Sequence, residues 1–274
     1  MLKLLSPAKI NLFLRVLGKR PDGYHELASL FQAVDLCDTL ECSLAQEDKL
    51  TCISSNIPLD STNLILKAAN LYRRKTGLTC GLRVHLDKKI PVQGGLGGGS
   101  SNAATALWAL NTLNNNLVQT KDLIAWSAEI GSDISFFFST GTAYCTGKGE
   151  QVQNQPPLVD KQFWIIKPPH GTSTPQVYKC LDLKTLHYRD PLIALESFQT
   201  TDPHYFNDLE EAAYNVMPNL RDIKNELQAG GFQAVLSGSG SSFFCVGEGK
   251  VPPLEGCESI QVKTVKRKLN SWYE

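Results

Sequence analysis

The segment Pro91, Val92, Gln93, Gly94, Gly95, Leu96, Gly97, Gly98, Gly99, Ser100, Ser101 is the part of the sequence best suited to chemistry. Five of the six residues at 94–99 are glycine, which costs conformational entropy on folding and therefore needs a reason. Close approach of the backbone to a ligand is such a reason, because successive N–H groups can turn inward around anionic oxygens. A helix-forming stretch follows, and a helix N-terminus offers free N–H donors and a partial positive charge. The sequence therefore predicts a polyphosphate cradle at 91–101.

Two familiar phosphate motifs fit this loop less well. A Walker loop places lysine directly before Ser or Thr, whereas Gly99 precedes Ser100 here. A dinucleotide fingerprint requires a βαβ unit, and the strands upstream are expected to be antiparallel. Without a Walker lysine, magnesium on ATP, the helix dipole and a lysine from elsewhere must share the neutralisation of charge. Ser100 and Ser101 either offer hydroxyls to phosphate or metal or simply cap the helix.

The elements that must position this loop follow from turn signals and hydrophobic periodicity. Residues 60–63 (Asp-Ser-Thr-Asn) offer N-cap side chains and Gly77 is a candidate stop for one helix, and Thr120 is a candidate N-cap for another. The expected helices lie at 64–77, 100–115, 120–130 and 219–231. The expected strands lie at 2–17, 27–34, 39–45, 49–54, 80–87, 141–153 (a hairpin), 163–168, 232–238 and 241–247. A strand-rich start followed by mixed elements indicates an α+β protein of two domains, with residues 155–157 as the best boundary.

Composition limits the classes of partner. Lysine plus arginine equal aspartate plus glutamate, 27 against 27 in 274 residues, which gives no support for a nucleic-acid or anionic-membrane partner. The start lacks the pattern of a signal peptide, and no segment reaches about 18 consecutive apolar residues. The eight cysteines form no CxxC pair and no zinc spacing. We therefore expect a cytoplasmic protein with reduced cysteines and no membrane or nucleic-acid partner.

Three motifs resemble those of a known family. The loop PVQGGLGGGSSNAA (91–104) resembles the second motif of the GHMP kinases, and LSGSGSSFFCV (236–246) resembles their last motif. The start SPAKINLFLRVLGKRPDGYHEL (6–27) resembles the members that act on a cytidine-diphosphate-linked polyol. The resemblance runs over nearly the whole chain, with two small departures. Gln93 stands where a glycine is common, and Ser135 stands where proline is usual.

The resemblance implies a fold, a cofactor and a substrate class. It implies an N-terminal ATP-binding domain at 1–155 with a ribosomal-S5-like left-handed βαβ unit, and a ferredoxin-like C-terminal domain at 156–274. The active site is expected between the two. ATP would be the phosphoryl donor with Mg²⁺, and the partner a small-molecule cytidine-diphosphate polyol. The protein would be a monomer or a weak homodimer, and the direct ligands of the metal stay unknown.

The resemblance also assigns the catalytic pair. Asp133, in IGSDISFF, matches the family's base, which accepts the proton of the acceptor hydroxyl; taken alone it would be an ordinary helix cap. Lys9 is the expected partner, because it lies between Ala8 and Ile10 in an apolar strand where an unpaired ammonium is costly. Beside the base, it would keep the carboxylate ionised and stabilise charge on the phosphoryl group. The alternative is a lysine on the solvent face of an edge strand.

The remaining site residues are substrate ligands by resemblance. Asn11 follows Lys9 at strand period two, so both side chains point to one face, and the family match makes it a ligand of a substrate hydroxyl. Tyr24 and His25 follow a Pro-Asp-Gly turn and would form the cytosine site, with His25 at the edge of the base. Tyr178 matches an aromatic position and would close the other side of that stack. Taken alone, Tyr24 and His25 would be loop anchors.

We therefore expect an enzyme that moves the γ-phosphoryl group of ATP onto a hydroxyl of a cytidine-diphosphate-linked polyol. One alternative is another GHMP kinase, such as one acting on homoserine or mevalonate. RPDGYHEL argues against it, because those substrates have no base to stack. A second alternative is a non-catalytic relative that binds the metabolite. The retention of both Lys9 and Asp133 argues against that.

Overall fold

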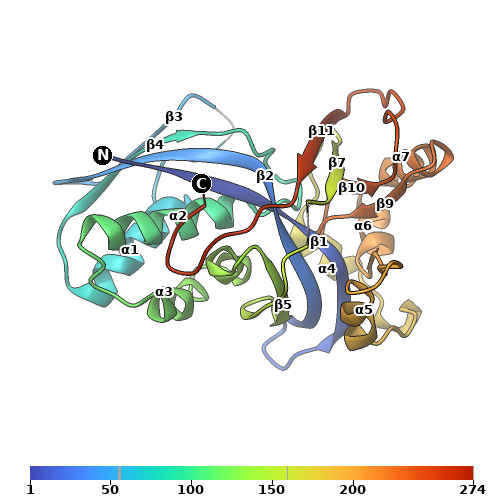
Figure 1. Ribbon diagram of the computed structural model, residues 1–274, viewed down its shortest axis with the longest axis horizontal. Coiled ribbons are helices and arrows are strands. Elements are labelled where there is room, and N and C mark those ends of the chain that lie inside the picture. The colour runs from blue at the N-terminus through green and yellow to red at the C-terminus, as the bar shows by residue number, and fades with distance from the viewer. Residues whose placement is uncertain (55–56, 159, 274) are drawn as a thin grey trace.

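Two long antiparallel strands form the spine of the molecule. The computed structural model describes residues 1–54, 57–158 and 160–273. Strands β1 (Leu2–Lys19) and β2 (His25–Ala45) pair along almost their whole length (Figure 1). Residues 6–16 of β1 are buried without alternation. Helix α2 packs on this strand, and apolar side chains of the C-terminal half pack against Ala8, Ile10 and Phe13, so the middle of β1 has little solvent-facing surface.

Strand β2 is a single element, so the prediction of two strands at 27–34 and 39–45 is wrong. The pairing shifts from Ala8↔Val34 to Pro7↔Cys37, so that β2 holds two extra residues at this point. Such a bulge bends a strand and changes its register without ending it. The polar residues between the two predicted strands mark this bulge rather than a turn.

The described strands form two sheets. The larger sheet has the path β3-β4-β2-β1-β8, with β5 and β6 attached to β2. Strands β3 (Lys49–Cys52) and β4 (Gly81–Asp87) run parallel and are joined by helix α1 (Leu64–Thr76). They form a βαβ unit, as the resemblance implied, and the expectation that the strands upstream of the loop are antiparallel is wrong for this pair. Strands β5 (Thr142–Gly147) and β6 (Gln151–Asn154) form the predicted hairpin.

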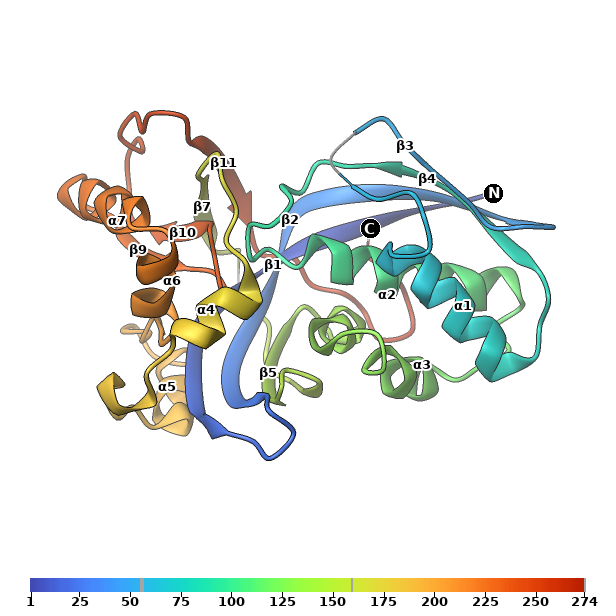
Figure 2. The same cartoon turned by 180° about the vertical axis from the view of Figure 1, so that it is seen from behind.

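Helices α1, α2 and α3 lie together on one side of the larger sheet (Figures 1 and 2). The predicted stop of α1 at Gly77 is confirmed by its left-handed φ of 74°, and of the four residues 60–63 it is Asn63 that caps the helix, because its Oδ1 accepts a hydrogen bond from the Ile65 amide. Helix α3 (Thr120–Ser127) has Gln119 rather than Thr120 as its N-cap. It ends before the predicted residue 130, because Glu129 and Ile130 donate to carbonyls three residues back and tighten the chain into turns.

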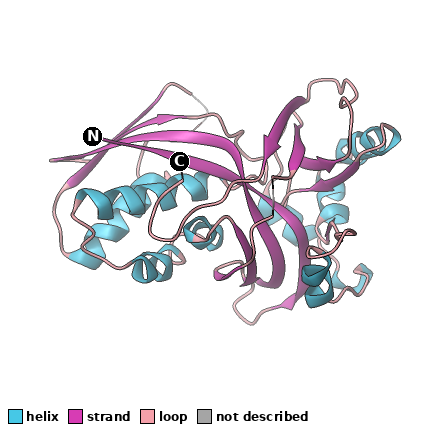
Figure 3. Ribbon diagram, in the orientation of Figure 1, coloured by secondary structure: helices cyan, strands magenta, loops and turns pink. Residues whose placement is uncertain are grey.

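The C-terminal half builds the second sheet and also contributes to the first. The antiparallel order is β11-β7-β10-β9, and Figure 3 shows these strands and their helices at the opposite end from α1–α3. The short strand β8 returns to pair with β1, and Trp272 near the C-terminus stacks on Trp108 of α2.

The domain boundary at 155/156 stays a prediction. None of the described helices is long and apolar enough to cross a bilayer. The other elements are α2 (Gly98–Leu113), the 3₁₀ helices η1 (Ser132–Phe138) and η2 (Leu183–Thr185), β7 (Gln162–Lys167), α4 (Thr174–Cys180), α5 (Pro191–Ser197), β8 (Phe206–Asn207), α6 (Glu210–Val216), α7 (Asn219–Ala229), β9 (Gln233–Leu236), β10 (Phe243–Val246) and β11 (Glu258–Lys263).

A buried carboxylate at the β2 bulge holds the chain that leads into the glycine-rich loop. Asp38 is fully buried and pairs with Lys88 Nζ at 2.5 Å. It also accepts the amides of Lys89 and Ile90 and the side-chain amide of Asn102 in α2. A charge that is paired and hydrogen-bonded in this way can remain ionised inside a protein.

We expect Asp38→Ala to lower the free energy of unfolding by about 3–5 kcal/mol, because it leaves the Lys88 ammonium and two backbone amides without their acceptor. Urea unfolding followed by circular dichroism measures the change. Asp87→Ala is the matched control, because Asp87 is 56% exposed and, among the described residues, forms an ion pair only with Lys89, at 3.6 Å; it should leave the unfolding midpoint nearly unchanged. Equal midpoints for the two variants would contradict the role given to Asp38.

Candidate active site between the two sheets

A cleft of about 940 Å³ lies where β1, the glycine-rich loop, η1 and the turn after β9 meet. Lys9, Asn11, Tyr24, His25, Asp133 and Tyr178 all line it, as do residues 91–100. The structure thus brings together predicted site residues that lie up to 169 positions apart in the chain, since Lys9 and Tyr178 share one cavity. Of the predicted site residues, only Ser101 lies outside the described lining of this cleft.

Lys9 and Asp133 meet inside the cleft. Lys9 Nζ lies 3.5 Å from Asp133 Oδ2, and the side chains are 3% and 32% exposed, respectively. Lys9 Nζ also donates to Asn11 Oδ1 at 2.6 Å and lies 4.9 Å from the centre of the Phe31 ring. The ammonium is therefore almost removed from water but has three favourable neighbours. The carboxylate, in contrast, keeps access to the cleft.

Asn11 is held in turn by β2. Its Nδ2 donates to Ser29 Oγ at 2.9 Å, and Ser29 Oγ donates to the carbonyl of Phe13. The side-chain oxygen of Asn11 is thereby directed at Lys9 rather than away from it. The chain from β2 through Asn11 fixes the ammonium of Lys9 before any ligand arrives.

The glycine-rich loop turns its carbonyls toward the protein. The carbonyls of Gly94, Gly95 and Leu96 accept hydrogen bonds from the Ser242 amide, Ser237 Oγ and the Lys9 amide. In a trans peptide the N–H of the next residue points opposite to the carbonyl, so the amides of Gly95, Leu96 and Gly97 face away from these three donors. The role of the loop as a phosphate cradle stays a prediction.

Helix α2 begins earlier than predicted. Its first residue is Gly98 and its N-cap is Gly97, with φ 69° and no side-chain cap, so the prediction of Ser100 and Ser101 as cap residues is wrong. The glycines themselves form the first turn, and the positive end of the helix therefore lies inside the cleft. Gln93 also has a positive φ, of 54°, which explains physically why glycine suits that position.

Ser101 is corrected from a ligand to a structural residue. It is fully buried, its amide donates to the Gly97 carbonyl at 2.8 Å, and its Oγ accepts from Ser6 Oγ at 2.8 Å. Its amide is therefore engaged within the helix, and burial keeps its hydroxyl out of the described lining of the cleft. Ser100, by contrast, lines the cleft.

The sequence analysis missed two groups of lining residues. The first is cationic: Lys88 reaches the cleft at the start of α2, where a Cβ on Gly98 would lie 2.8 Å from Lys88 Nζ. The second precedes α1 and consists of Ile57, Pro58, Thr62, Asn63 and Leu64. No motif in the sequence marks either group. The doublet Lys88-Lys89 beside the loop was the one available signal for the first.

Charge in the described cleft is strongly positive. Five lysines line it, at 9, 19, 88, 148 and 179, and among the described lining residues Asp133 is the one carboxylate. The chain as a whole is neutral, so this local excess suits a polyphosphate rather than an extended anionic partner. No cluster of three or more His, Cys, Asp or Glu that could hold a metal occurs in the described residues.

The predicted base-binding residues lie at one end of the cleft. The rings of His25 and Tyr178 stack directly on each other, with centroids 5.0 Å apart, while Tyr24 is 60% exposed. Lys148 Nζ lies 4.7 Å from the centre of the Tyr24 ring. Burial lowers the pKa of His25, and the positive charge of Lys19 adds to this effect. Burial raises the pKa of Tyr178, and the negative charge of Asp133 adds to it.

Comparison with known families gives the class. Residues 63–141 match the GHMP kinases N terminal domain, and residues 192–260 match the GHMP kinases C terminal family. These two segments contain the glycine-rich loop with Asp133, and the turn after β9. The chain belongs to the GHMP kinases, and the predicted α+β class and fold are confirmed.

Curated relatives narrow the family. The chain is 51% identical to the 4-diphosphocytidyl-2-C-methyl-D-erythritol kinase of Protochlamydia amoebophila, with 99% of this chain and 93% of the relative covered. It is 46% identical to the chloroplastic 4-diphosphocytidyl-2-C-methyl-D-erythritol kinase of Arabidopsis thaliana, with 100% and 76% covered. Within the GHMP kinases, the chain belongs to the 4-diphosphocytidyl-2-C-methyl-D-erythritol kinase family.

Solved structures agree with this placement. A crystal structure of a 4-(cytidine 5'-diphospho)-2C-methyl-D-erythritol kinase superposes with a TM-score of 0.80 at 32% identity, covering 96% of this chain and 99% of the other. A homoserine kinase from Cytophaga hutchinsonii gives 0.69 at 19% identity, with 97% and 95% covered. The latter likeness shows the fold alone.

We expect Gly95→Ala to impair nucleotide binding, because a Cβ at this residue would lie 2.0 Å from the Ser237 carbonyl oxygen. Shifting the loop should raise the KM for ATP by about tenfold or more, which steady-state kinetics measures. Gly77→Ala is the matched control. Gly77 has the same φ within a degree, 74° against 73°, but a Cβ there meets nothing within 4 Å. It should lose about 1 kcal/mol of stability through backbone strain alone and keep its KM. Equal KM changes in both variants would contradict the role of the Gly95 contact.

Proposed function

We propose that this protein transfers the γ-phosphoryl group of ATP to the 2-hydroxyl of 4-diphosphocytidyl-2-C-methyl-D-erythritol, a step of the non-mevalonate route to isoprenoid precursors. The observation that carries the proposal is the approach of Lys9 Nζ to Asp133 Oδ2, 3.5 Å apart, in the cleft that the glycine-rich loop also lines. Membership of the family supports the substrate.

Asp133 is the proposed base. Its carboxylate is one-third exposed and so can reach a substrate hydroxyl, whose proton it accepts as the oxygen attacks the γ-phosphorus. The bond from the γ-phosphorus to the bridging oxygen breaks, and ADP leaves with that electron pair. Lys9 keeps the carboxylate ionised and stabilises negative charge on the phosphoryl oxygens. Asn11, 2.6 Å from Lys9 Nζ, is the proposed ligand of a substrate hydroxyl.

The nucleotide is proposed to lie along the glycine-rich loop. The inward-facing carbonyls of Gly94, Gly95 and Leu96 support the placing of phosphates on the opposite, N–H side of the chain. Lys88 is the proposed cation that takes the place of a Walker lysine. Ile57, Pro58 and Leu64, which line the same cleft, offer apolar surface for the purine. These residues extend the predicted cradle at 91–100 toward α1.

Magnesium is proposed to arrive with the phosphates of ATP. Mg²⁺ keeps several waters and commonly takes only one or two carboxylates together with substrate phosphates, and the cleft offers Asp133 and the Ser100 hydroxyl. The residues present therefore fit a metal held mainly by the nucleotide. When bound, it would neutralise charge on the phosphate oxygens.

The cytosine is proposed to lie on Tyr24 with its edge toward His25. Because His25 and Tyr178 already stack on each other, a base does not fit between those two rings in this arrangement. Tyr178 then acts by holding the imidazole of His25, while the exposed Tyr24 ring offers its face. Direct stacking of Tyr178 on the base stays a prediction, as do the monomer or weak homodimer state and the cytoplasmic location.

Measurement of ADP release separates the alternatives. The proposal expects turnover with the cytidine substrate and none with homoserine or mevalonate. A homoserine or mevalonate kinase would show the reverse preference. A non-catalytic relative would release no ADP above the rate without acceptor.

We expect Lys9→Ala and Asp133→Ala each to lower kcat by about 10²-fold or more, the size typical of a lost acid–base or electrostatic group. Rapid-quench or coupled assays measure the change, and circular dichroism checks that the fold survives. Lys3→Ala is the control in the same strand, because Lys3 is 68% exposed and pairs only with Glu41 among the described residues; it should keep normal turnover. Near-normal kcat at position 9 or 133 would refute the role of that residue.

We expect the KM for the cytidine substrate to be flat above about pH 7 and to rise below about pH 6. Burial and Lys19 lower the pKa of His25 from its ordinary 6.5, so the imidazole is neutral at pH 7 and takes up its proton only in more acidic solution. The same protonation opposes the buried position of the ring. KM measured from pH 5 to 9 tests this, with His25→Gln as the comparison. An identical acid rise in His25→Gln would exclude His25 as its source.

A further inference from the structure

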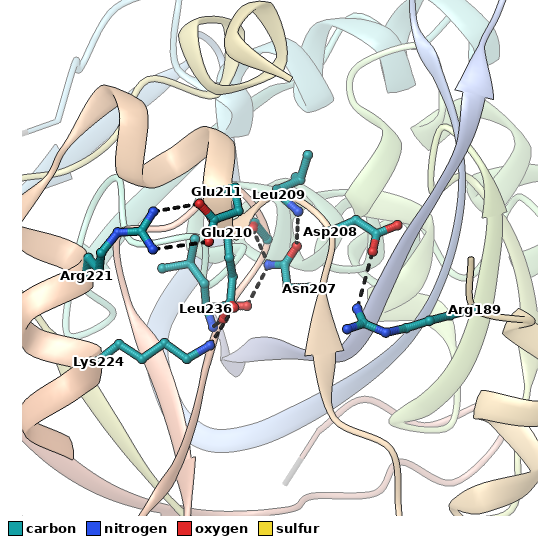
Figure 4. Close-up of polar contacts among 10 residues, drawn as sticks. Arg189, Asn207, Asp208, Leu209, Glu210, Glu211, Arg221, Lys224 and Leu236 are labelled. Atoms are coloured by element: carbon teal, nitrogen blue, oxygen red, sulfur yellow. Dashed lines mark hydrogen bonds and ion pairs between the residues drawn. The ribbon is translucent and has the colours of Figure 1, made fainter. Parts of the chain in front are cut away.

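The short segment from Asn207 to Glu210, which runs from the end of β8 to the start of α6, makes contacts that the proposed mechanism does not use. Asn207 ends β8 and is 5% exposed. Its Nδ2 donates to the carbonyls of Leu236 and Gly238, both at 2.7 Å, and its Oδ1 accepts from the Leu209 amide at 2.9 Å. Figure 4 shows this amide directed at the chain around Leu236. Both N–H groups and the oxygen of the side chain are therefore occupied.

The side chain of the next residue, Asp208, points the other way and binds to β1. Asp208 Oδ2 pairs with Arg15 Nη1 at 2.5 Å and accepts the Val16 amide at 2.9 Å, and the Asp208 amide donates to the Leu14 carbonyl. In Figure 4 the Asp208 side chain is directed at Arg189, away from the amide of Asn207. Alternating directions are what an extended chain provides. The dipeptide 207–208 thus ties β1, which carries Lys9 and Asn11, to the turn at 236–240.

That turn forms one wall of the phosphate site. Ser237 Oγ donates to the Gly95 carbonyl at 3.1 Å, and the Ser242 amide donates to the Gly94 carbonyl at 3.1 Å. Gly238 lies against the catalytic lysine, because a Cβ there would be 3.3 Å from Lys9 Nζ. A shift of the turn would therefore move the glycine-rich loop and the surroundings of Lys9 together.

Glu210 reinforces the same attachment from α6. Its Oε1 accepts the Leu236 amide at 2.9 Å, and its Oε2 pairs with Lys224 Nζ at 2.5 Å (Figure 4). The backbone of Leu236 is consequently held on both sides, by Asn207 at its carbonyl and by Glu210 at its amide. Glu211, the neighbour of Glu210, pairs instead with the exposed Arg221 and does not reach the turn.

We propose that Asn207 is a positioning residue for phosphoryl transfer: it fixes the 236–240 turn against the glycine-rich loop and Lys9 without touching either substrate. This inference rests on the proposed function for its kinetic consequence. Asparagine is required because its two N–H groups serve two carbonyls at once. An aspartate of the same shape would set a carboxylate against both carbonyl oxygens, which repels them.

Asn207→Asp is expected to lower kcat by about tenfold or more and to raise the KM for ATP, because loop and lysine lose their shared support. The KM for the cytidine substrate should rise less than the KM for ATP, because the turn contacts the glycine-rich loop directly but reaches His25 only indirectly, through Ser239, Thr174 of α4 and Tyr178. Asn207→Ser, which keeps one donor, should fall between wild type and Asn207→Asp, and it serves if the aspartate variant does not fold.

Two controls separate positioning from loss of stability. Leu71→Ala removes a buried side chain of α1 (3% exposed), so it should lower the melting temperature and leave kcat unchanged at a temperature where it is folded. Glu211→Gln alters α6 beside the segment without touching the turn and should leave both unchanged. The comparison holds if the two variants have the same melting temperature. If Leu71→Ala then loses as much kcat as Asn207→Asp, the proposal is overturned.

Amide hydrogen exchange provides a readout that does not depend on activity. Peptides covering 236–242 should exchange about tenfold faster in Asn207→Asp, and not in Leu71→Ala, because the turn has lost its anchor. Unchanged exchange overturns the inference, and so does faster exchange with kcat and the KM for ATP as in wild type. If wild type releases no ADP with the cytidine substrate, the proposed function fails. In that case two measurements on wild type and Asn207→Asp decide the role of Asn207: hydrogen exchange at 236–242 and the affinity for a non-hydrolysable ATP analogue. Faster exchange with weaker binding in Asn207→Asp supports the role, and no change in either overturns it.

Discussion

The buried ammonium of Lys9 is the constraint on which the rest of the site depends. A charge that is only 3% exposed is costly unless it is paired and hydrogen-bonded. Here Asn11, Asp133 and the face of Phe31 meet that need from three different elements. β2 holds Asn11 through Ser29, and η1 brings Asp133 to the same point. The arrangement of the larger sheet and η1 is thus what allows one buried cation to be satisfied.

The glycines of the loop allow the two halves of the chain to pack closely, in addition to their proposed role in binding phosphate. A Cβ on Gly95 would overlap the Ser237 carbonyl, and one on Gly97 would lie 2.9 Å from Lys9 Cγ. The entropy lost by ordering these glycines is offset in part by close packing of two chain segments that lie about 140 residues apart. Because the loop touches both Lys9 and the 236–240 turn, its ligand-facing side is set by contacts on its other side.

Local signals in the sequence predicted a large part of this structure. The polar run at 60–63 and Gly77 gave the ends of α1, and glycine density located the loop, because caps and left-handed residues depend on near neighbours. The bulge in β2 and the start of α2 at Gly98 were missed. Both are decided by distant partners: β2 continues past residue 38 because β1 pairs along its whole length, and Ser101 is taken into the interior by Ser6. The roles of Lys9 and Asp133 came from family resemblance, and their approach required the fold.

Charge explains why the remaining site residues escaped the sequence. A neutral chain of 27 cations and 27 anions shows no basic segment, yet the described cleft gathers five lysines around one carboxylate. Lys88 is held there by Asp38, 50 residues away, and the carboxylate is fully buried. The Lys88 and Asp38 side chains are 7% and 0% exposed, so the pair is buried together and the carboxylate offsets part of the ammonium's charge. The positive excess of the cleft therefore comes from lysines that the fold gathers from distant parts of the chain, and a count of residues along the sequence does not reveal that arrangement.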